Sequence, residues 1–218
     1  MYANSPMIET PQSGPHPRLL DVVERHRRHA WQRPYAAHSL AAFERLQQWL
    51  QAHPGRQLIL DSGCGTGAST VLLAESHPVH AVLGIDQSAA RLGRATAELA
   101  NALRLRAPLE DLWRLMLAQG FRPLRHCLWY PNPWPKPEHL QRRWHGHPVF
   151  QQLLALGGAL ELRSNWRLYV DEFALALQAC GHQGIITAID ASDEPVSPFE
   201  RKYRDSGHGL WRLSVDLG

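Results

Sequence analysis

Long apolar runs are missing from this sequence of 218 residues. A membrane-spanning helix needs roughly 18 consecutive apolar residues, and no stretch of the chain approaches that length. The first residues also lack the basic and then apolar pattern of a secretory signal. On these grounds we expect a cytoplasmic protein without a membrane partner.

Cysteine is scarce as well, with only Cys64, Cys127 and Cys180 in the whole chain. An odd number of cysteines at wide spacing does not form a disulfide framework, and no two of them have the close spacing of zinc ligands. The thirteen histidines include several near the N-terminus that have no acidic or cysteine pattern around them. The sequence therefore predicts neither disulfides nor a metal site.

Charge of one sign is not in large excess, since 23 Lys and Arg residues face 20 Asp and Glu residues, for a net charge of +3. This balance permits an anionic partner without requiring one.

The distribution of proline and arginine divides the chain into three parts. Residues 1–17 carry four prolines among small polar residues, which predicts a disordered segment. Residues 18–53 show a helical pattern rich in arginine and histidine, which predicts a basic N-terminal helical arm. Residues 54–218 alternate between apolar and amphipathic segments, which predicts a single catalytic domain.

Seven apolar segments of that domain are typical of strands. They are Leu58–Leu60, Ala81–Ile85, Leu103–Leu105, Leu124–Tyr130, Ala159–Leu162, Gly184–Ile189 and Leu210–Val215. Helical patterns lie between them: they begin at Ala68 and Ser88 and cover Glu110–Leu117, Arg142–Leu156 and Tyr169–Cys180. This alternation predicts an α/β fold with one doubly wound, mostly parallel sheet.

A glycine-rich turn, Asp61-Ser62-Gly63-Cys64-Gly65-Thr66-Gly67, follows the first predicted strand. Its spacing differs from the dinucleotide motif G-x-G-x-x-G, and it lacks the Gly-Lys-Ser/Thr ending of a P-loop. Asp61 suits an amino group and would repel a pyrophosphate. Asp86 ends the second predicted strand, which is the usual position of a carboxylate that accepts both ribose hydroxyls. Together the two acids indicate S-adenosylmethionine, a nucleoside that carries an amino acid.

The stiffest segment of the chain is Tyr130-Pro131-Asn132-Pro133-Trp134-Pro135-Lys136. Its prolines remove backbone donors, fix φ and bias the preceding residues to extended geometry, so Asn132 and Trp134 are held in one presentation. The segment follows the fourth predicted strand, at the edge of a parallel sheet where ligands bind. We therefore interpret it as a rigid loop of the functional site.

Four segments together resemble the bacterial tRNA (guanine-N7-)-methyltransferase family, from about Leu58 to the C-terminus. The glycine-rich turn and Gly84-Ile85-Asp86 are similar to the ends of the family's first two strands. The proline-rich loop, with His139 and Arg142-Arg143 behind it, is similar to the family's Asp-Pro-Trp-x-Lys loop. Two further segments are similar to its Thr-Asp-Trp turn and its Thr-Lys-Phe-Glu segment with the closing strand: Gly157 to Tyr169, and Val196–Glu200 with Gly207–Trp211.

The resemblance implies a Rossmann-like methyltransferase that acts on tRNA, and the sequence leaves open whether the protein is a monomer or a weak homodimer. It transfers a methyl group from S-adenosylmethionine to nitrogen 7 of guanine in the variable loop by in-line displacement. Nitrogen 7 carries no proton, so no general base or metal is needed. The implied cofactor residues are Asp61, Gly63, Gly65, Gly67, Asp86, Glu110 and Asn132, of which Asn132 is also the implied catalytic residue. The implied substrate residues are Lys136, Arg142, Arg143, Asn165, Ser197 and Glu200.

The chain departs from the family on the substrate side. Asn132 stands for the acid of the loop, Asn165 for the acid of the Thr-Asp-Trp turn, and Ser197-Pro198 for a Thr-Lys pair. An amide still accepts a hydrogen bond, but losing the charge costs about 1–2 kcal/mol for each contact, or roughly tenfold in binding or rate.

The acid after the third strand, which holds the adenine amino group in the family, is also displaced. Leu109 occupies one alignment, and Glu110 or Asp111 occupies the next. We favour Glu110.

Two other functions stay open at this point. Asn132-Pro133-Trp134 resembles the Asn-Pro-Pro-aromatic loop of methyltransferases that act on exocyclic amines of bases. The lost charges are also compatible with a catalytically weak paralogue that binds RNA or a protein partner.

Overall fold

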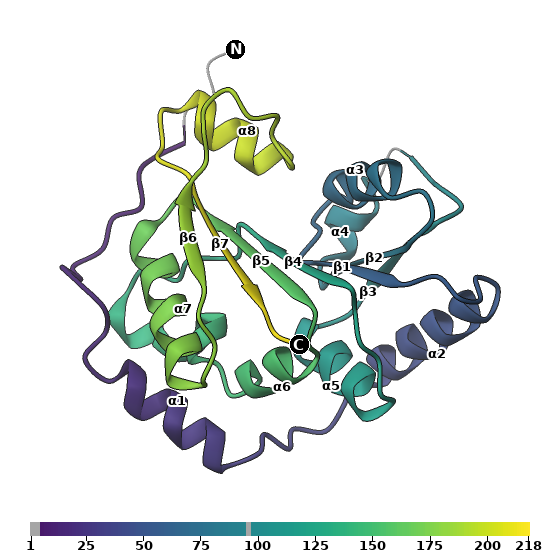
Figure 1. Ribbon diagram of the computed structural model, residues 1–218, viewed down its shortest axis with the longest axis horizontal. Coiled ribbons are helices and arrows are strands. Elements are labelled where there is room, and N and C mark those ends of the chain that lie inside the picture. Colours follow the sequence, from purple (N-terminus) through teal and green to yellow (C-terminus); the bar gives the residue numbers. More distant parts are fainter. Residues whose placement is uncertain (1–4, 95–96) are drawn as a thin grey trace.

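A computed structural model describes residues 5–94 and 97–218 of the protein. Its centre is a seven-stranded sheet of order β3-β2-β1-β4-β5-β7-β6 (Figure 1). The strands are β1 (Leu58–Ser62), β2 (Ala81–Asp86), β3 (Ala102–Arg106), β4 (Arg125–Trp129), β5 (Ala159–Ser164), β6 (Ile185–Ala188) and β7 (Trp211–Asp216). Neighbouring strands are parallel except where β7 pairs with β5 and β6. The predicted α/β fold with a mostly parallel sheet is confirmed, and each predicted strand overlaps an observed one.

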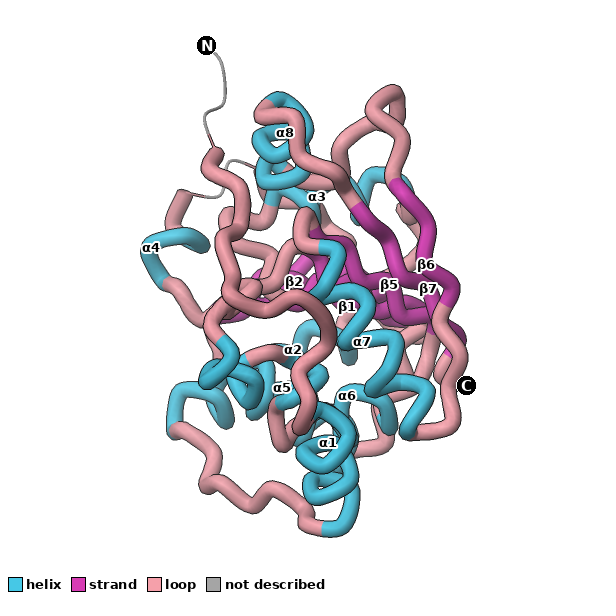
Figure 2. Tube along the Cα trace, turned by 90° about the vertical axis from the view of Figure 1, so that its left-hand side faces the viewer, coloured by secondary structure: helices cyan, strands magenta, loops and turns pink. Residues whose placement is uncertain are grey.

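Helices cover both faces of this sheet (Figures 1 and 2). One face carries α1 (Leu19–Arg28), α2 (Ala37–Gln51), α5 (Leu109–Ala118), α6 (Phe150–Ala155) and α7 (Arg167–Ala179). On the other side lie α3 (Ala68–Ser76), α4 (Ala89–Leu92) and α8 (Pro198–Asp205). None of the helices in the described part of the chain is long and apolar enough to cross a membrane.

Alternation along the central strands explains the two covered faces. Leu58 and Leu60 of β1 belong to the larger apolar core, whereas Ile59 between them belongs to a smaller core with Leu73 of α3. Successive side chains of a strand point to opposite faces, so an uninterrupted apolar run must be covered on both. The apolar run Leu58–Leu60 therefore suits the interior position of β1 in the sheet.

The predicted helix over Arg142–Leu156 is confirmed only in its last part, where the short helix α6 lies. Before α6, the chain forms two 3-10 helices, η1 (Pro137–Arg142) and η2 (Trp144–Gly146), in place of a continuous helix. Arg143 between them is extended, with φ −73° and ψ 140°. Pro148 forces the same geometry on His147, because the residue before a proline avoids the helical region. Helix α8, which begins at Pro198, was not predicted.

The predicted disorder of residues 1–17 does not hold for residues 5–17, whereas residues 1–4 lie outside the described part. The segment runs along the domain and then enters α1 (Figure 1). Ile8 packs against the core, and the Thr10 hydroxyl donates to the carbonyl of Pro135 over 2.7 Å. Prolines make an extended segment lose less entropy when it is bound, which compensates for its lack of apolar residues.

Asp111 attaches the N-terminal arm to the sheet layer. Its buried carboxylate accepts hydrogen bonds from the backbone N–H of Ala36 at 3.1 Å and from the hydroxyl of Ser39 at 2.7 Å. Both donors lie at the start of α2, so one acid of α5 fixes where the second helix of the arm begins.

We expect Asp111→Ala to lower the free energy of unfolding by about 2–3 kcal/mol, because two bonds to a charged acceptor are lost and a buried hydroxyl loses its partner. Urea denaturation measures the change. Glu44→Ala, on the exposed side of α2, is the control and should change stability by less than about 0.5 kcal/mol. Equal midpoints for the two variants would contradict this role of Asp111.

Candidate active site

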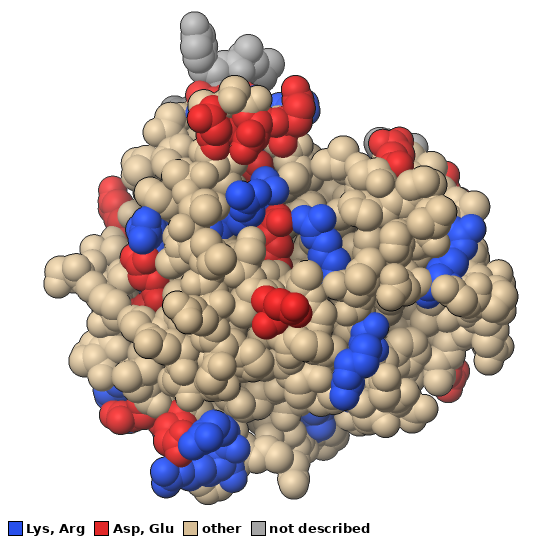
Figure 3. Space-filling model, in the orientation of Figure 1, with Lys and Arg blue, Asp and Glu red and all other residues tan. Residues whose placement is uncertain are grey.

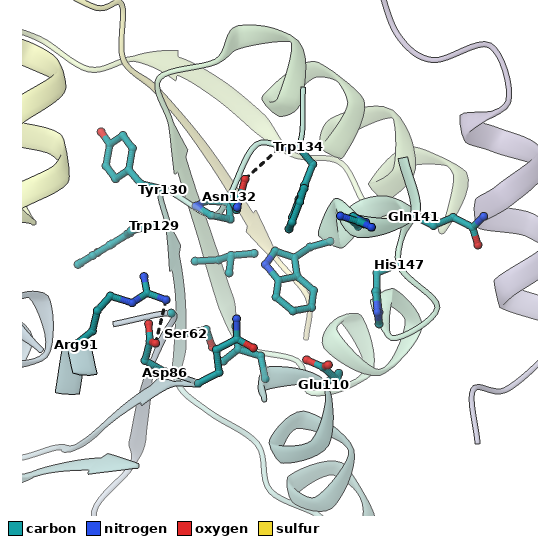
Figure 4. A pocket seen from close by; sticks show the side chains of 17 residues that line it. Ser62, Asp86, Arg91, Glu110, Trp129, Tyr130, Asn132, Trp134, Gln141 and His147 are labelled. Carbon is teal, nitrogen blue, oxygen red and sulfur yellow. Dashed lines mark hydrogen bonds and ion pairs between the residues drawn. The ribbon is translucent and has the colours of Figure 1, made fainter. Parts of the chain in front are cut away.

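A cavity of about 430 Å³ opens beyond the carboxyl ends of β1, β2 and β4 (Figure 4). Its volume lies within the range of small-molecule sites. In doubly wound sheets, ligands bind at this edge, where the strand order reverses, and here that point lies between β1 and β4. Of the residues implied by the sequence, the walls contain Gly63, Asp86, Glu110, Asn132 and Arg142.

The glycine-rich turn approaches the cavity with its backbone. Gly63, Gly65 and Gly67 have φ values of 84°, 61° and 82°, which residues with a side chain rarely adopt. A Cβ at Gly63 would meet nothing within 4 Å, so the turn is open there, whereas a Cβ at Gly67 would come within 2.5 Å of Arg104 Cδ. Gly63 therefore borders the cavity, while Gly65 and Gly67 shape the turn.

Asp61 lies behind this turn and is not one of the residues that line the cavity. Its Oδ2 accepts hydrogen bonds from Ser69 Oγ at 2.7 Å and from Thr70 Oγ1 at 2.6 Å. Burial raises the pKa of Asp61 to about 6, in spite of these two bonds. The carboxyl group therefore ties the first turn of α3 to β1, and the structure does not place it against an amino group.

Asp86 presents its carboxylate to the cavity from the end of β2. Its Oδ2 accepts the N–H of Gly65 at 3.0 Å, and its Oδ1 accepts the N–H of Ser88 at 2.7 Å. Oδ1 also lies 3.1 Å from Arg91 Nη2 (Figure 4). The same acid thus shapes the glycine-rich turn and offers hydrogen-bond acceptors to a ligand.

The structure distinguishes the three residues that could take the place of the family's acid after β3. Leu109 and Glu110 line the cavity, whereas Asp111 faces the arm. Glu110 Oε1 lies 3.8 Å from Arg33 Nη1, and its side chain is 19% exposed. Glu110 is therefore the acid of this group that can reach a bound ligand.

The proline-rich loop forms the wall opposite Asp86 and Glu110 (Figure 4). Asn132 lines the cavity, and its Oδ1 accepts the N–H of Trp134 at 3.3 Å. The predicted extended geometry fails at Trp134, whose φ of 48° lies in the left-handed region. The guanidinium of Arg142 lies 4.8 Å from the centroid of the Trp134 ring. The loop therefore offers an amide, an aromatic face and a cation to the cavity.

Lys136 and Arg143 lie outside the cavity walls. Lys136 is exposed at the end of the loop. Arg143 is a correction, because it is fully buried and cannot meet an RNA backbone. Its neighbour Arg142 ends a 3-10 helix, whereas Arg143 is extended, and this change of backbone geometry turns adjacent side chains in opposite directions.

The remaining substrate residues implied by the sequence connect α8 to the sheet. Glu200 is buried and accepts Arg163 Nη1 at 2.9 and 3.2 Å. Ser197 caps α8 by accepting the N–H of Glu200, and Asn165 contacts His208 at 3.0 Å. Tyr130 extends toward α8 and away from Trp134 (Figure 4). None of Asn165, Ser197 and Glu200 lines the cavity in this conformation.

The basic arm borders the cavity instead of forming a separate surface. Arg25 Nη2 donates to Gln141 Oε1 over 3.1 Å, and Trp31 packs edge-on against His147, with ring centroids 5.0 Å apart. Gln141 and His147 both line the cavity. Arg27 and Arg28 of α1 pair with Glu24, and basic and acidic residues are interspersed over this face (Figure 3).

Several wall residues were missed by the sequence interpretation: Ser62, Gln87, Arg91, Trp129, Gln141, Trp144 and His147. Gln87 and Arg91 follow Asp86 closely, and their proximity in sequence was a usable signal. Trp144 and His147 were hidden by the prediction of a continuous helix over Arg142–Leu156, and Gln141 directly precedes that segment. The described residues contain no cluster of three or more potential metal ligands.

Titration of Asp61 should make stability depend on pH. Its pKa is about 6 in the folded protein against an ordinary 3.8, so the folded state binds the proton more tightly than the unfolded state. Ionisation of the buried Asp61 carboxyl therefore lowers the free energy of unfolding. This loss is absent below about pH 4 and grows to about 3 kcal/mol as the pH rises through 6. Urea unfolding from pH 4 to 7.5 should show this loss relative to Asp61→Asn, which cannot ionise.

The matched control is Asp193→Asn, at an exposed position. Its free energy of unfolding should differ from that of the wild type by the same amount at every pH in this range. If the difference between Asp61→Asn and the wild type is also independent of pH, the raised pKa of Asp61 is refuted.

Comparisons with known proteins identify the family of the chain. A family model described as "Putative methyltransferase" matches residues 55–213. The tRNA (guanine-N(7)-)-methyltransferase of Leifsonia xyli subsp. xyli (strain CTCB07) is 30% identical over 169 residues, which are 71% of this chain and 73% of that protein.

Two solved structures share the fold. An antibiotic-related methyltransferase superposes with a TM-score of 0.59 at 12% identity, over 85% of this chain and 96% of that one. A mutant 16S rRNA (adenine(1408)-N(1))-methyltransferase from Catenulisporales acidiphilia, solved with its cosubstrate SAM, has a TM-score of 0.55 at 18% identity, over 78% of this chain and 88% of that one. With the family match over most of the domain, the chain belongs to the tRNA (guanine-N(7)-)-methyltransferase family.

Proposed function

We propose that the protein transfers a methyl group from S-adenosylmethionine to nitrogen 7 of guanine in the variable loop of tRNA. One observation carries this function: a single cavity brings the acids Asp86 and Glu110 opposite the loop of Asn132 and Trp134. The acids suit the methyl donor, and the loop suits the base. Because tRNA is the substrate, we place the activity in the cytoplasm.

The cavity fits S-adenosylmethionine on its own chemistry. Asp86 offers a carboxylate to two ribose hydroxyls, and Glu110 offers one to the adenine amino group. The open space beside Gly63 lets the methionine part pass close to the backbone. S-adenosylmethionine, when bound, supplies a methyl group that is already activated by a positively charged sulfur.

The opposite wall positions the acceptor. The Trp134 ring, with Arg142 over it, offers a stacking surface for a base. Nitrogen 7 of guanine has a free lone pair, so the wall has to align the base with the methyl group and need not remove a proton. Asn132, at the tip of this wall, is the polar group that we assign to this alignment.

Exposed cations next to the loop suit the RNA backbone. Arg142 and Lys136 are both exposed, and they flank the loop that carries Asn132. Such contacts supply affinity that depends on salt and carry little sequence information. Ser197 caps α8, Asn165 contacts His208, and a contact of Glu200 with guanine requires Glu200 to leave Arg163.

The exocyclic-amine alternative is not favoured. Such a reaction needs an amide oxygen that accepts from the amino group of the base. In this structure the Oδ1 atom of Asn132 accepts the N–H of Trp134, which leaves one lone pair for a ligand. The preference therefore rests on the similar proteins, which are named tRNA (guanine-N(7)-)-methyltransferases.

We expect Asp86→Ala to weaken S-adenosylmethionine binding at least tenfold in calorimetry, because hydrogen bonds that the ribose hydroxyls donate to a charged acceptor are each worth about 1.5–3 kcal/mol. Asp86→Asn keeps one acceptor oxygen and should bind with intermediate affinity. The control is Glu75→Ala, at an exposed acid of α3 outside this cavity, which should bind like the wild type. Unchanged affinity in Asp86→Ala would remove Asp86 from the binding site.

The function itself is tested by mass spectrometry of nucleosides from unmodified tRNA incubated with the protein and S-adenosylmethionine. We expect 7-methylguanosine from the wild type. Asn132→Asp should raise the rate up to roughly tenfold, because a carboxylate restores charge assistance to a hydrogen bond with the base. A methyl group on an exocyclic amine, or no methylated nucleoside at all, would disprove the proposed function.

A further inference from the structure

We infer that residues 10–16, together with buried Arg143, form a strap that holds the proline-rich loop in the shape that receives the base. This positioning role rests on the proposed function. It begins with a contact between segments 125 positions apart, in which the Thr10 hydroxyl donates to the carbonyl of Pro135 over 2.7 Å. The same hydroxyl oxygen accepts the N–H of Gln12 at 3.2 Å. Since a hydroxyl has one proton, this arrangement commits it to the loop.

The loop needs such donors because it has few of its own. Residues 131, 133, 135 and 137 are prolines and have no N–H, so the loop cannot build a regular backbone hydrogen-bond pattern. Three successive carbonyls are bonded from outside the loop. Arg143 Nε donates to Trp134 O over 3.1 Å, Thr10 donates to Pro135 O, and Arg143 Nη2 reaches Lys136 O at 3.4 Å.

Arg143 joins the strap to the rest of the domain. Its guanidinium is fully buried, and it donates to Gln12 Oε1 in the strap and to Glu172 Oε2 of α7. Glu172 accepts three further bonds, from Gln12 Nε2 at 3.1 Å, from the N–H of His16 at 2.8 Å and from His145 Nε2 at 3.0 Å. An ion pair inside a protein is tolerable only when its remaining hydrogen-bonding groups are satisfied, and the strap supplies two of the bonds to Glu172.

The strap acts on the conformation of Trp134. A residue before a proline prefers extended geometry, yet Trp134 is held at φ 48°. If the hydrogen bond to the carbonyl of Trp134 or of Pro135 is lost, Trp134 can return toward extended geometry. Its ring then moves away from Arg142. The cofactor acids Asp86 and Glu110 make no bond to the strap among the described contacts, so release should affect the acceptor and leave methyl-donor binding unchanged.

The experiment compares Thr10→Val with Thr10→Ser in the full chain. Valine has the shape of threonine without the hydroxyl, and serine keeps the hydroxyl. We expect Thr10→Val to lower kcat/KM for tRNA about three- to tenfold, with the dissociation constant for S-adenosylmethionine within twofold of the wild type. Gln12→Ala should show a larger loss, and Thr10→Ser should restore wild-type kinetics.

Hydrogen exchange gives a second measurement that does not need activity. Peptides covering residues 130–143 should exchange faster in Thr10→Val and Gln12→Ala than in the wild type. Thr10→Ser should match the wild type, as should the control Ser13→Ala, at an exposed strap position without a contact to the loop.

The strap is disproved if the loop exchanges as slowly in both Thr10→Val and Gln12→Ala as in the wild type. It is also disproved if both variants keep the wild-type kcat/KM for tRNA. If the wild type forms no 7-methylguanosine, the proposed function fails, and loop exchange alone then decides whether the strap exists.

Discussion

The buried ion pair between Arg143 and Glu172 is the interaction on which the acceptor side of the site depends. Two charges without solvent cost several kcal/mol each unless every remaining donor and acceptor is matched. Here the matching groups come from the strap, from His145 and from the loop carbonyls themselves. The stability of the pair and the shape of the loop therefore depend on each other, and both involve three regions that are far apart in sequence: residues 10–16, residues 134–145 and Glu172.

The two sides of the cavity are built in different ways. The donor side consists of strand ends, the glycine-rich turn and the first turns of helices, all of them rigid and linked by short connections. Asp86 illustrates this economy, because it bonds the N–H groups of Gly65 and Ser88 and still faces the cavity. The acceptor side has almost no regular structure and takes its shape from distant partners. This difference between the two sides suits a fold that binds the same methyl donor in every case and different methyl acceptors.

Charge is arranged along the same division. Among the described residues that line the cavity, the acids are Asp86 and Glu110, both on the donor side. Glu200, the acid that the family resemblance assigns to the base, is paired with Arg163, and Asn132 is neutral. Under the proposed function, the acceptor side presents exposed Arg142 and Lys136 to a polyanionic RNA, and the buried acid Glu200 is already paired.

The sequence by itself determined the sheet, the glycine-rich turn, the two strand-end acids and the position of the loop. These features depend on local rules: short continuous apolar segments between helical patterns, φ values that favour glycine, and proline's missing N–H. The sequence could not show that Arg143 is buried beside exposed Arg142, that Asp61 turns to α3, or that residues 5–17 are bound. Those outcomes were decided by tertiary structure, because they depend on which distant donor meets each carbonyl and carboxylate, and such pairings leave no local pattern in the chain.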